Sequence, residues 1–375
     1  MARRRQNRQK AKSISLSGRF NFPKVDRVLL LLTVLLSVLG LLAVADASAP
    51  QALAVFGDSY HFAKQQLRWM ILGYAALVAG ASIHYKTWEK YANSFYILTV
   101  ILLIIVLLPG IGNRLLGARR WISLGFFSFQ PAEFAKLSLA MVVAYAASKK
   151  TDFIKILGII GFTAALIMLQ PDLGTTIVVV SIGFAQAFVA GAPLLYFLLS
   201  TLGGGALAAM LVLFSDYRRA RLMTFLQSSA DPLGESYHMR QILFALGSGG
   251  LFGAGIGQSR QKQLFLPETA SDSVFAVMAE ELGFMGSAAI LVLLLFFVIR
   301  VFKIAKNAPD TFSKVLATGI GIWIGGQMFL NIASMVALIP LTGIPLPFFS
   351  YGGSSLVMIL FGVGILLNIS SHETK

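Results

Sequence analysis

The 375-residue sequence contains no cysteine and few charged residues. Without cysteine the chain can have neither a disulfide framework nor a thiolate metal site. Only 13% of its residues are charged, whereas a soluble domain carries about a quarter. This shortage, with a mean hydropathy of +0.77, excludes an ordinary soluble protein. The net charge of +15 therefore needs an explanation other than nucleic-acid binding.

Apolar runs long enough to cross a bilayer recur along the whole chain. The predicted fold class is an all-α polytopic membrane protein with about ten spanning helices. We expect these helices near residues 28–45, 66–84, 92–109, 132–148, 153–169, 173–190, 194–214, 273–299, 315–338 and 352–370. The predicted organisation is a basic tail at 1–27, a single membrane domain at 28–370 and a short tail at 371–375.

The distribution of Lys and Arg predicts which side of the membrane each loop faces. With the N-terminus in the cytoplasm, ten spans return the C-terminus there, and 19 of the 31 basic residues lie in cytoplasmic segments. This bias agrees with the positive-inside rule. The first span, followed by residues 45–49, partly imitates a signal peptide, but its length favours an uncleaved anchor. The basic first 20 residues would bind anionic lipid or a cytoplasmic partner.

The loop from about 215 to 272, between spans seven and eight, is far longer than the others and would lie outside the cytoplasm. Loops of this length are uncommon unless they are functional. Most of the polar chemistry lies in this loop and in the outer loop at 110–131. The glycine-rich stretch at 247–257 matches neither the dinucleotide fingerprint nor the Walker spacing, which excludes a nucleotide site of either kind.

Three basic clusters lie in outer loops, where the charge rule expects few basic residues. They are Arg119 and Arg120 beside Trp121, then Arg218 and Arg219, then Arg260 and Lys262. Guanidinium groups bind phosphate through paired N–H bonds, and Trp121 could pack against a sugar or lipid. Interfacial Arg and Trp at helix ends are the alternative. The repetition of the clusters favours a site for a pyrophosphate-like headgroup.

Glu133 and Lys136 open the fourth span and lie three residues apart, on one helix face, where they can pair. Both would be costly facing lipid, so we expect them to face the protein interior or a cavity. A structural ion pair and a direct role with the substrate both fit this pattern. Asp172, in the outer turn at 170–176, is expected to cap the following helix.

Four carboxylates lie at or near the start of the eighth span. Asp272 sits where the apolar run begins, so partial desolvation should raise its pKa, which suits a general base. A helix N-cap is the alternative for Asp272. Glu280 and Glu281 are adjacent and cannot share a helix face, so at least one needs its own polar partner. Glu268, a few residues before Asp272, belongs to the same loop.

The last outer loop, at 339–355, contains three prolines and a glycine pair, which break helix at membrane depth. Non-helical backbone at that depth must be buried in protein or line a cavity. This loop therefore supports an internal site near the outer surface, and Ser350 lies within it.

Together these segments resemble the SEDS family, the FtsW, RodA and SpoVE proteins of bacterial wall synthesis. The matching stretches, in the family's order, are 117–122, 130–137, 170–176, 231–241, 249–268, 272–283 and 345–355. The resemblance implies a ten-helix fold and peptidoglycan glycosyltransferase activity on lipid II, an undecaprenyl-pyrophosphate disaccharide-pentapeptide. The family's essential loop aspartate falls on Asp272, although its usual Asp-Phe-Ile-Phe neighbourhood reads Asp-Ser-Val-Phe here.

The resemblance also implies a mechanism and partners. Asp272 would activate the acceptor sugar 4-hydroxyl for attack on the donor anomeric carbon. No cofactor is certain, although Mg²⁺ or Mn²⁺ could assist the leaving pyrophosphate. Expected partners are a class B penicillin-binding protein, other divisome or elongasome membrane proteins and membrane lipids, with no nucleic acid. The candidate substrate-binding residues are Arg119, Arg120, Trp121, Glu133, Lys136, Arg218, Arg219, Lys262, Glu268 and Ser350.

Within the family, the basic N-terminal tail favours an FtsW-like division protein at the septum of the cytoplasmic (inner) membrane. The stretch at 342–347 is closer to RodA, the elongation protein. Two other functions remain open, a lipid II flippase and a non-catalytic division scaffold. A polymerase needs Asp272 for chemistry, whereas a flippase could tolerate Asn there.

Overall fold

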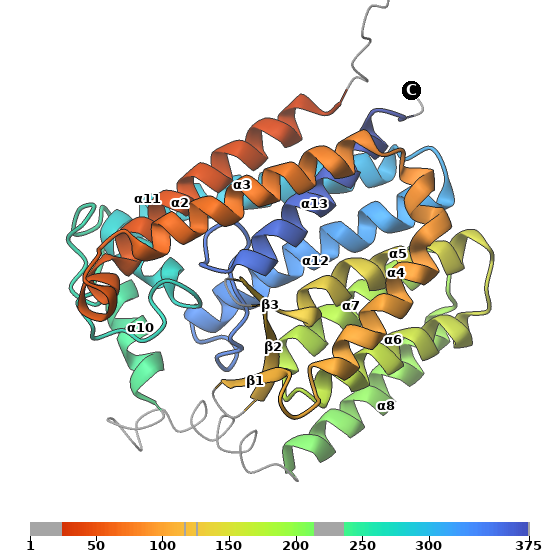
Figure 1. Ribbon diagram of the computed structural model, residues 1–375, viewed down its shortest axis with the longest axis horizontal. Coiled ribbons are helices and arrows are strands. Elements are labelled where there is room, and N and C mark those ends of the chain that lie inside the picture. Colours follow the sequence, from red (N-terminus) through yellow and green to blue (C-terminus); the bar gives the residue numbers. More distant parts are fainter. Residues whose placement is uncertain (1–24, 116–117, 125–126, 214–235, 374–375) are drawn as a thin grey trace, which may run out of the picture.

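The computed structural model describes residues 25–115, 118–124, 127–213 and 236–373. Within these residues ten long helices form one bundle (Figure 1), and each overlaps one of the expected spans. They are α2 (Arg27–Phe56), α3 (His61–Ser82), α4 (Tyr85–Ile105), α5 (Pro131–Ser148), α6 (Phe153–Met168), α7 (Leu173–Val189), α8 (Leu194–Leu213), α11 (Val274–Lys306), α12 (Thr311–Met335) and α13 (Gly353–Ser370). The expected multi-pass helical fold is therefore confirmed.

Length and composition single out some of these helices. In the described part of the chain, α2, α4, α11, α12 and α13 are long and apolar enough to cross a membrane. Helices α6 and α7 and the first part of α8 are shorter apolar helices. The leucines along the first half of α8 are exposed, and Figure 1 shows this helix at the edge of the bundle. That surface fits contact with lipid tails.

Polar residues just outside the apolar runs begin several helices. Asp26 accepts a hydrogen bond from the Leu29 N–H at the start of α2. Asp310 and Ser313 form a reciprocal capping box at the start of α12. Asp172 caps α7 by accepting from the Thr175 N–H at 3.0 Å, as the sequence predicts. These caps satisfy N–H groups that have no partner within the helix.

The core lies around α12 and α13, which pass through the middle of the bundle in Figure 1. Helix α13 packs closely on α3 because glycines occupy the contact. A Cβ atom at Gly364 would lie 2.2 Å from the Leu77 carbonyl oxygen, and one at Gly80 would lie 2.8 Å from that of Phe361. Small residues let the two backbones approach as membrane helices commonly do.

The start of α2 and the end of α13 lie at the same end of the bundle (Figure 1). The Asp26 N–H donates to Ser370 Oγ at 3.0 Å, and the Asp26 carboxylate pairs with Arg300 at 2.6 Å. A chain that crosses the membrane an even number of times begins and ends on the same side, as these two helix ends do. The loops that carry most of the candidate residues join the helices at the opposite end.

The all-α prediction misses a small antiparallel sheet in the outer segment at 110–131. Its strands are β1 (Gly112–Leu115), β2 (Ala118–Leu124) and β3 (Phe127–Phe129), paired in that order. Trp121 pairs with Asn113, and Ile122 pairs with both Gly112 and Phe129. The strands are short, so they leave no hydrophobic run by which periodicity could reveal them.

Two features near the long outer loop also differ from expectation. Within the loop, Tyr237–Ser248 forms an additional helix, α10. Helix α11 is interrupted at Gly283, whose φ of 67° and ψ of −170° are not helical. The part after the break is about 34 Å long at 1.5 Å per residue. That length alone crosses a hydrocarbon layer of about 30 Å. Glu280 and Glu281 lie on the loop side of this break.

Candidate functional site

Asp272 lies in the turn immediately before α11 and is half-buried. Ser273, and not Asp272, occupies the N-cap position of α11, and the Ser273 side chain makes no capping hydrogen bond. The Ser273 hydroxyl instead lies 2.8 Å from His238 Nε2 on α10. The chain thus presents the Asp272 carboxyl group from a turn that is bound to neighbouring elements.

The last outer loop lies against this turn. The Tyr351 N–H donates to the Ala270 carbonyl oxygen at 2.7 Å. A Cβ atom on Gly343 would lie 3.4 Å from Asp272 Oδ2, which places that carboxylate oxygen beside the loop backbone. Asn331 on α12 donates to the carbonyl oxygens of Asp272 and Ile344. Asn331 is not among the residues predicted from the sequence, although a polar side chain inside an apolar span is a usable signal.

The arginines of β2 contact backbone carbonyl oxygens of neighbouring segments. Arg119 Nη1 donates to Leu107 O at 3.3 Å. Arg120 Nε donates to Gln170 O at 3.0 Å, and its Nη2 donates to Pro171 O. Because a guanidinium group has five N–H donors, each arginine retains N–H groups beyond these contacts. Arg119, Arg120 and Trp121 are half-buried, so a ligand could reach them from the outer side.

Glu133 and Lys136 form a buried ion pair at the start of α5, with 2.6 Å between Lys136 Nζ and Glu133 Oε1. Both residues are at most 2% exposed, so the predictions of pairing and of an interior position are confirmed. The ammonium also lies 5.7 Å from the centre of the Trp323 ring on α12. Glu133 Oε2 is buried and has no hydrogen-bond partner among the described residues.

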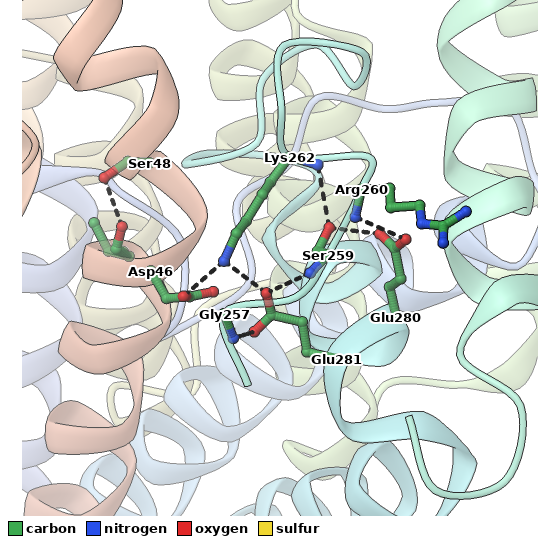
Figure 2. A network of polar contacts seen from close by, with 9 residues as sticks. Asp46, Ser48, Gly257, Ser259, Arg260, Lys262, Glu280 and Glu281 are labelled. Atoms are coloured by element: carbon green, nitrogen blue, oxygen red, sulfur yellow. Dashed lines mark hydrogen bonds and ion pairs between the residues drawn. The ribbon is translucent and has the colours of Figure 1, made fainter. Parts of the chain in front are cut away.

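Lys262 lies in a buried network that joins three parts of the chain (Figure 2). Its Nζ atom is 2.7 Å from Asp46 Oδ1 on α2 and 2.7 Å from Glu281 Oε1 on α11. Burial lowers the pKa of Lys262, but the hydrogen bonds to the two carboxylates outweigh that effect and raise it above its ordinary value. The Lys262 charge is therefore matched by protein carboxylates, and not left for a phosphate.

Glu280 and Glu281 bind the backbone of residues 257–261, where the glycine-rich stretch ends. The N–H groups of Gly257 and Ser259 donate to Glu281 at 3.0 and 3.1 Å. The Arg260 N–H donates to Glu280 at 3.1 Å (Figure 2), and the Gln261 N–H donates to Glu280 at 3.2 Å. Each carboxylate thus has its own set of donors, which agrees with their expected positions on different helix faces.

The remaining candidates make local contacts or lie outside the described residues. Glu268 is exposed and accepts a hydrogen bond from Ser271 Oγ at 2.6 Å. Ser350 is buried, and its hydroxyl accepts from the Leu346 N–H at 2.7 Å, which shapes the last outer loop. Arg218 and Arg219 fall within the segment that the structure does not describe.

Among the described residues, no group of three or more His, Asp or Glu side chains could hold a metal ion. The carboxylates in Figure 2 are already bound by Lys262 and by backbone N–H groups, so they are not available as metal ligands. These residues do not fit a protein-bound Mg²⁺ or Mn²⁺, and no chemical step is assigned to one.

Comparison with known proteins gives relatives along nearly the whole chain. The family model for FtsW, RodA and SpoVE, described as "cell cycle protein", matches residues 26–375. Stage V sporulation protein E of Bacillus subtilis is 42% identical over 356 residues, which cover 93% of this chain and 97% of that protein. The probable peptidoglycan glycosyltransferase FtsW of Trichlorobacter lovleyi is 38% identical over 360 residues, which cover 94% of each chain.

Solved structures share the fold. The crystal structure of the rod shape determining protein RodA of Thermus thermophilus superposes with a TM-score of 0.71 at 28% identity, and the match covers 95% of this chain and 99% of RodA. A chain from a peptidoglycan synthase complex, studied for its coordination of polymerization and crosslinking, superposes with a TM-score of 0.78 at 27% identity. That match covers 93% of this chain and 98% of the other.

Proposed function

The chain belongs to the FtsW, RodA and SpoVE family of cell cycle proteins, and we propose that it polymerises lipid II with Asp272 as the general base. Relatives named peptidoglycan glycosyltransferase FtsW support the reaction class. The position of Asp272 carries the proposal. It is half-buried in the turn before α11, at the end of the bundle where the outer loops meet.

The reaction assigned to this site is an inverting glycosyl transfer. The acceptor 4-hydroxyl loses its proton to the Asp272 carboxylate as its oxygen forms a bond to the donor anomeric carbon. The bond from that carbon to the pyrophosphate oxygen breaks, and the leaving undecaprenyl pyrophosphate takes the bonding electrons. A carboxylate held close to the hydroxyl lowers the barrier by accepting the proton in the transition state.

Candidates for binding the pyrophosphate are the remaining N–H groups of Arg119 and Arg120, together with Arg218 and Arg219, which lie outside the described residues. Bidentate guanidinium contacts suit phosphate oxygens. Trp121 is the candidate for packing against the sugar or the lipid. The contacts of Lys262, Glu268 and Ser350 with the protein itself favour structural roles for them.

A groove between α11 and α12 is the candidate docking site for the single membrane helix of a class B penicillin-binding protein. The groove has a volume of about 280 Å³ and an apolar lining that includes Leu295, Phe302, Gly326 and Phe329. The Gly321 and Gly325 pair, whose spacing suggests close helix packing, faces Val298, Val301 and Phe302 of α11. Gly326 beside them has no neighbour within 4 Å of its Cβ position, so the groove is open there.

The proposed setting is the bacterial cytoplasmic membrane during division or elongation. Relatives named FtsW favour the division-type branch over the RodA branch. The division septum and other divisome proteins follow from that assignment as proposals. Fluorescent fusions imaged in dividing cells would separate a septal from a lateral-wall location.

The deciding experiment supplies lipid II to the purified protein, with and without its penicillin-binding partner, and resolves glycan polymer on a gel. We expect polymer from the wild type and none from Asp272→Asn, with equal folding and lipid II binding. No polymer from either protein, even with the partner and Mg²⁺ or Mn²⁺, would favour a flippase or a scaffold. Equal polymer from both would retain the enzyme and overturn the role of Asp272. Repeating the assay with EDTA tests the need for a divalent cation.

A further inference from the structure

Asn331 is a fully buried polar residue near the end of α12, with 1% of its surface exposed. Its Nδ2 atom donates to Asp272 O at 3.1 Å and to Ile344 O at 2.8 Å. One side-chain amide therefore binds two backbone segments that are far apart in the sequence. A carboxamide NH₂ has the two N–H donors that this double contact requires.

The two segments that Asn331 joins are the turn that carries Asp272 and the last outer loop. Tyr351 N–H, donating to Ala270 O, forms a second connection between them. Gly343 has a φ of 68°, and its Cβ position lies 3.4 Å from Asp272 Oδ2. The loop backbone thus lies beside the carboxylate. The Asn331 side chain binds both the turn and the loop to α12.

We propose that Asn331 is a positioning residue that sets the place of the Asp272 carboxylate against the last outer loop. This inference rests on the proposed function, because the position of Asp272 matters to the reaction only if Asp272 is the base. Asn331 itself contacts backbone atoms and not the substrate. Its loss lets the turn and the loop separate. A displacement of about 1 Å can cost roughly 100-fold in rate when reacting groups must be aligned.

Gln186 on α7 offers a matched control within the same chain. It is also fully buried, and its Nε2 donates to two backbone carbonyl oxygens, Ala140 O at 2.8 Å and Val315 O at 3.0 Å. Its two contacts join α5 and α12 and involve neither Asp272 nor the last outer loop. Replacing Gln186 with Ala removes an equivalent pair of side-chain amide hydrogen bonds from the bundle. It leaves the segments that flank Asp272 bound to each other.

The test compares wild type, Asn331→Ala, Gln186→Ala and Asp272→Asn for lipid II polymerisation and for hydrogen exchange at the Tyr351 amide. We expect Asn331→Ala to lower kcat by about 10- to 100-fold, with KM within about twofold, because alignment and not binding is lost. The Tyr351 amide should exchange faster in this variant. Gln186→Ala should lower the unfolding temperature at least as much but keep the wild-type kcat and Tyr351 exchange.

The two readouts separate the inference from the function on which it rests. Wild-type kcat and wild-type Tyr351 exchange in Asn331→Ala would overturn the inference while an inactive Asp272→Asn still supports the base. Equal losses of kcat in Asn331→Ala and Gln186→Ala would also overturn it, since general destabilisation would then suffice. If the wild type makes no polymer, the proposed function fails. Unchanged exchange in Asn331→Ala would then reject the role of Asn331 independently.

Discussion

Lys262 and Glu281 form a buried ion pair in which Nζ and Oε1 are 2.7 Å apart, with both side chains at most 6% exposed. The same ammonium lies 2.7 Å from Asp46 on α2 (Figure 2). Lys262 thus connects the segment that follows the glycine-rich stretch to α2 and α11. Breaking a buried pair leaves an uncompensated charge, which is the costly event in such networks.

We expect Lys262→Met to lower the free energy of unfolding by about 3 kcal/mol, because it leaves Glu281 buried without its cation. Thermal unfolding in detergent measures the effect. Lys64→Met is the matched control, since Lys64 and Asp58 are also 2.7 Å apart but 61% and 39% exposed. An exposed pair of this kind contributes little to stability. If Lys262→Met unfolds like the wild type but binds lipid II weakly, Lys262 belongs to the headgroup site instead.

Lys262 illustrates which contacts can be predicted from the sequence and which cannot. Apolar runs predict the ten long helices because burial in lipid requires an unbroken hydrophobic stretch. Local spacing likewise predicts that Asp172 caps α7 and that Glu133 pairs with Lys136, since these partners lie three residues apart. Lys262 meets Asp46 from 216 residues away, and no local pattern announces such a contact. Its charge in an outer loop therefore suggested a phosphate ligand.

The difference between local patterns and long-range contacts also explains which parts of the candidate site were predicted and which were missed. The aspartate, the arginines and the proline-rich loop were found from their residue types and a family resemblance. Asn331 was missed because its partners, Asp272 and Ile344, are backbone atoms brought together only by folding. The strands and α10 were missed because short amphipathic elements in a loop produce weak periodicity.

Gly283 should tolerate no side chain. Its φ is 67°, and a Cβ atom would lie 2.2 Å from the Gly253 nitrogen, where the glycine-rich loop crosses the break in α11. We expect Gly283→Ala to lower the yield of monodisperse protein and its unfolding temperature clearly. Gly161→Ala on α6 is the control, because nothing lies within 4 Å of that Cβ position. It should be neutral or stabilising by up to about 1 kcal/mol. Equal behaviour of the two variants would contradict the close crossing.

His84 should make the free energy of unfolding sensitive to acid. It lies at the start of α4. Its Nδ1 accepts a hydrogen bond from the Lys86 N–H at the start of α4. Burial, then the charges of His372 and Lys86, lower the pKa of His84 below 6.5. The unfolded chain therefore binds the proton more readily. The stability contribution of His84 is complete above pH 6.5 and is lost as the pH falls through the lowered value.

The prediction for His84 is that wild type loses more unfolding temperature between pH 7.5 and pH 5 than His84→Asn does. Asn is a good N-cap residue and does not titrate. The comparison of the two proteins, each measured at both pH values, cancels the contribution of titrating groups that His84 does not influence. The same loss in both would show that His84 does not contribute to acid sensitivity.

Filling the groove between α11 and α12 should prevent binding of a partner helix. Gly326 lines the groove and has open space at its Cβ position. We expect Gly326→Leu to reduce copurification of the class B penicillin-binding protein by at least about tenfold, as a loss of about 1.4 kcal/mol produces. Gly161→Leu, at an equally open position on α6, should copurify as the wild type does. Undiminished binding by Gly326→Leu would place the partner on another face.

The last prediction concerns Glu133 and Lys136, whose ion pair could serve the fold or the substrate. Lys136→Met leaves Glu133 charged and buried, so we expect a loss of about 3–5 kcal/mol in the free energy of unfolding. Glu133→Gln combined with Lys136→Met removes both charges and should recover most of that loss. The two substitutions should therefore couple by at least about 2 kcal/mol in a double-mutant cycle. Unfolding in detergent measures each variant.

Lys149 and Glu89 provide the control cycle for this pair. Their charged atoms are 3.6 Å apart and the side chains are 57% and 21% exposed, so their coupling should be at most about 1 kcal/mol. Coupling as weak at Glu133 and Lys136 would contradict the buried pair. Polymer formation by the folded double variant then assigns the role. Retained activity makes the ion pair structural, because neutral side chains of similar shape replace it. Lost activity with intact folding shows that the charges themselves serve the reaction.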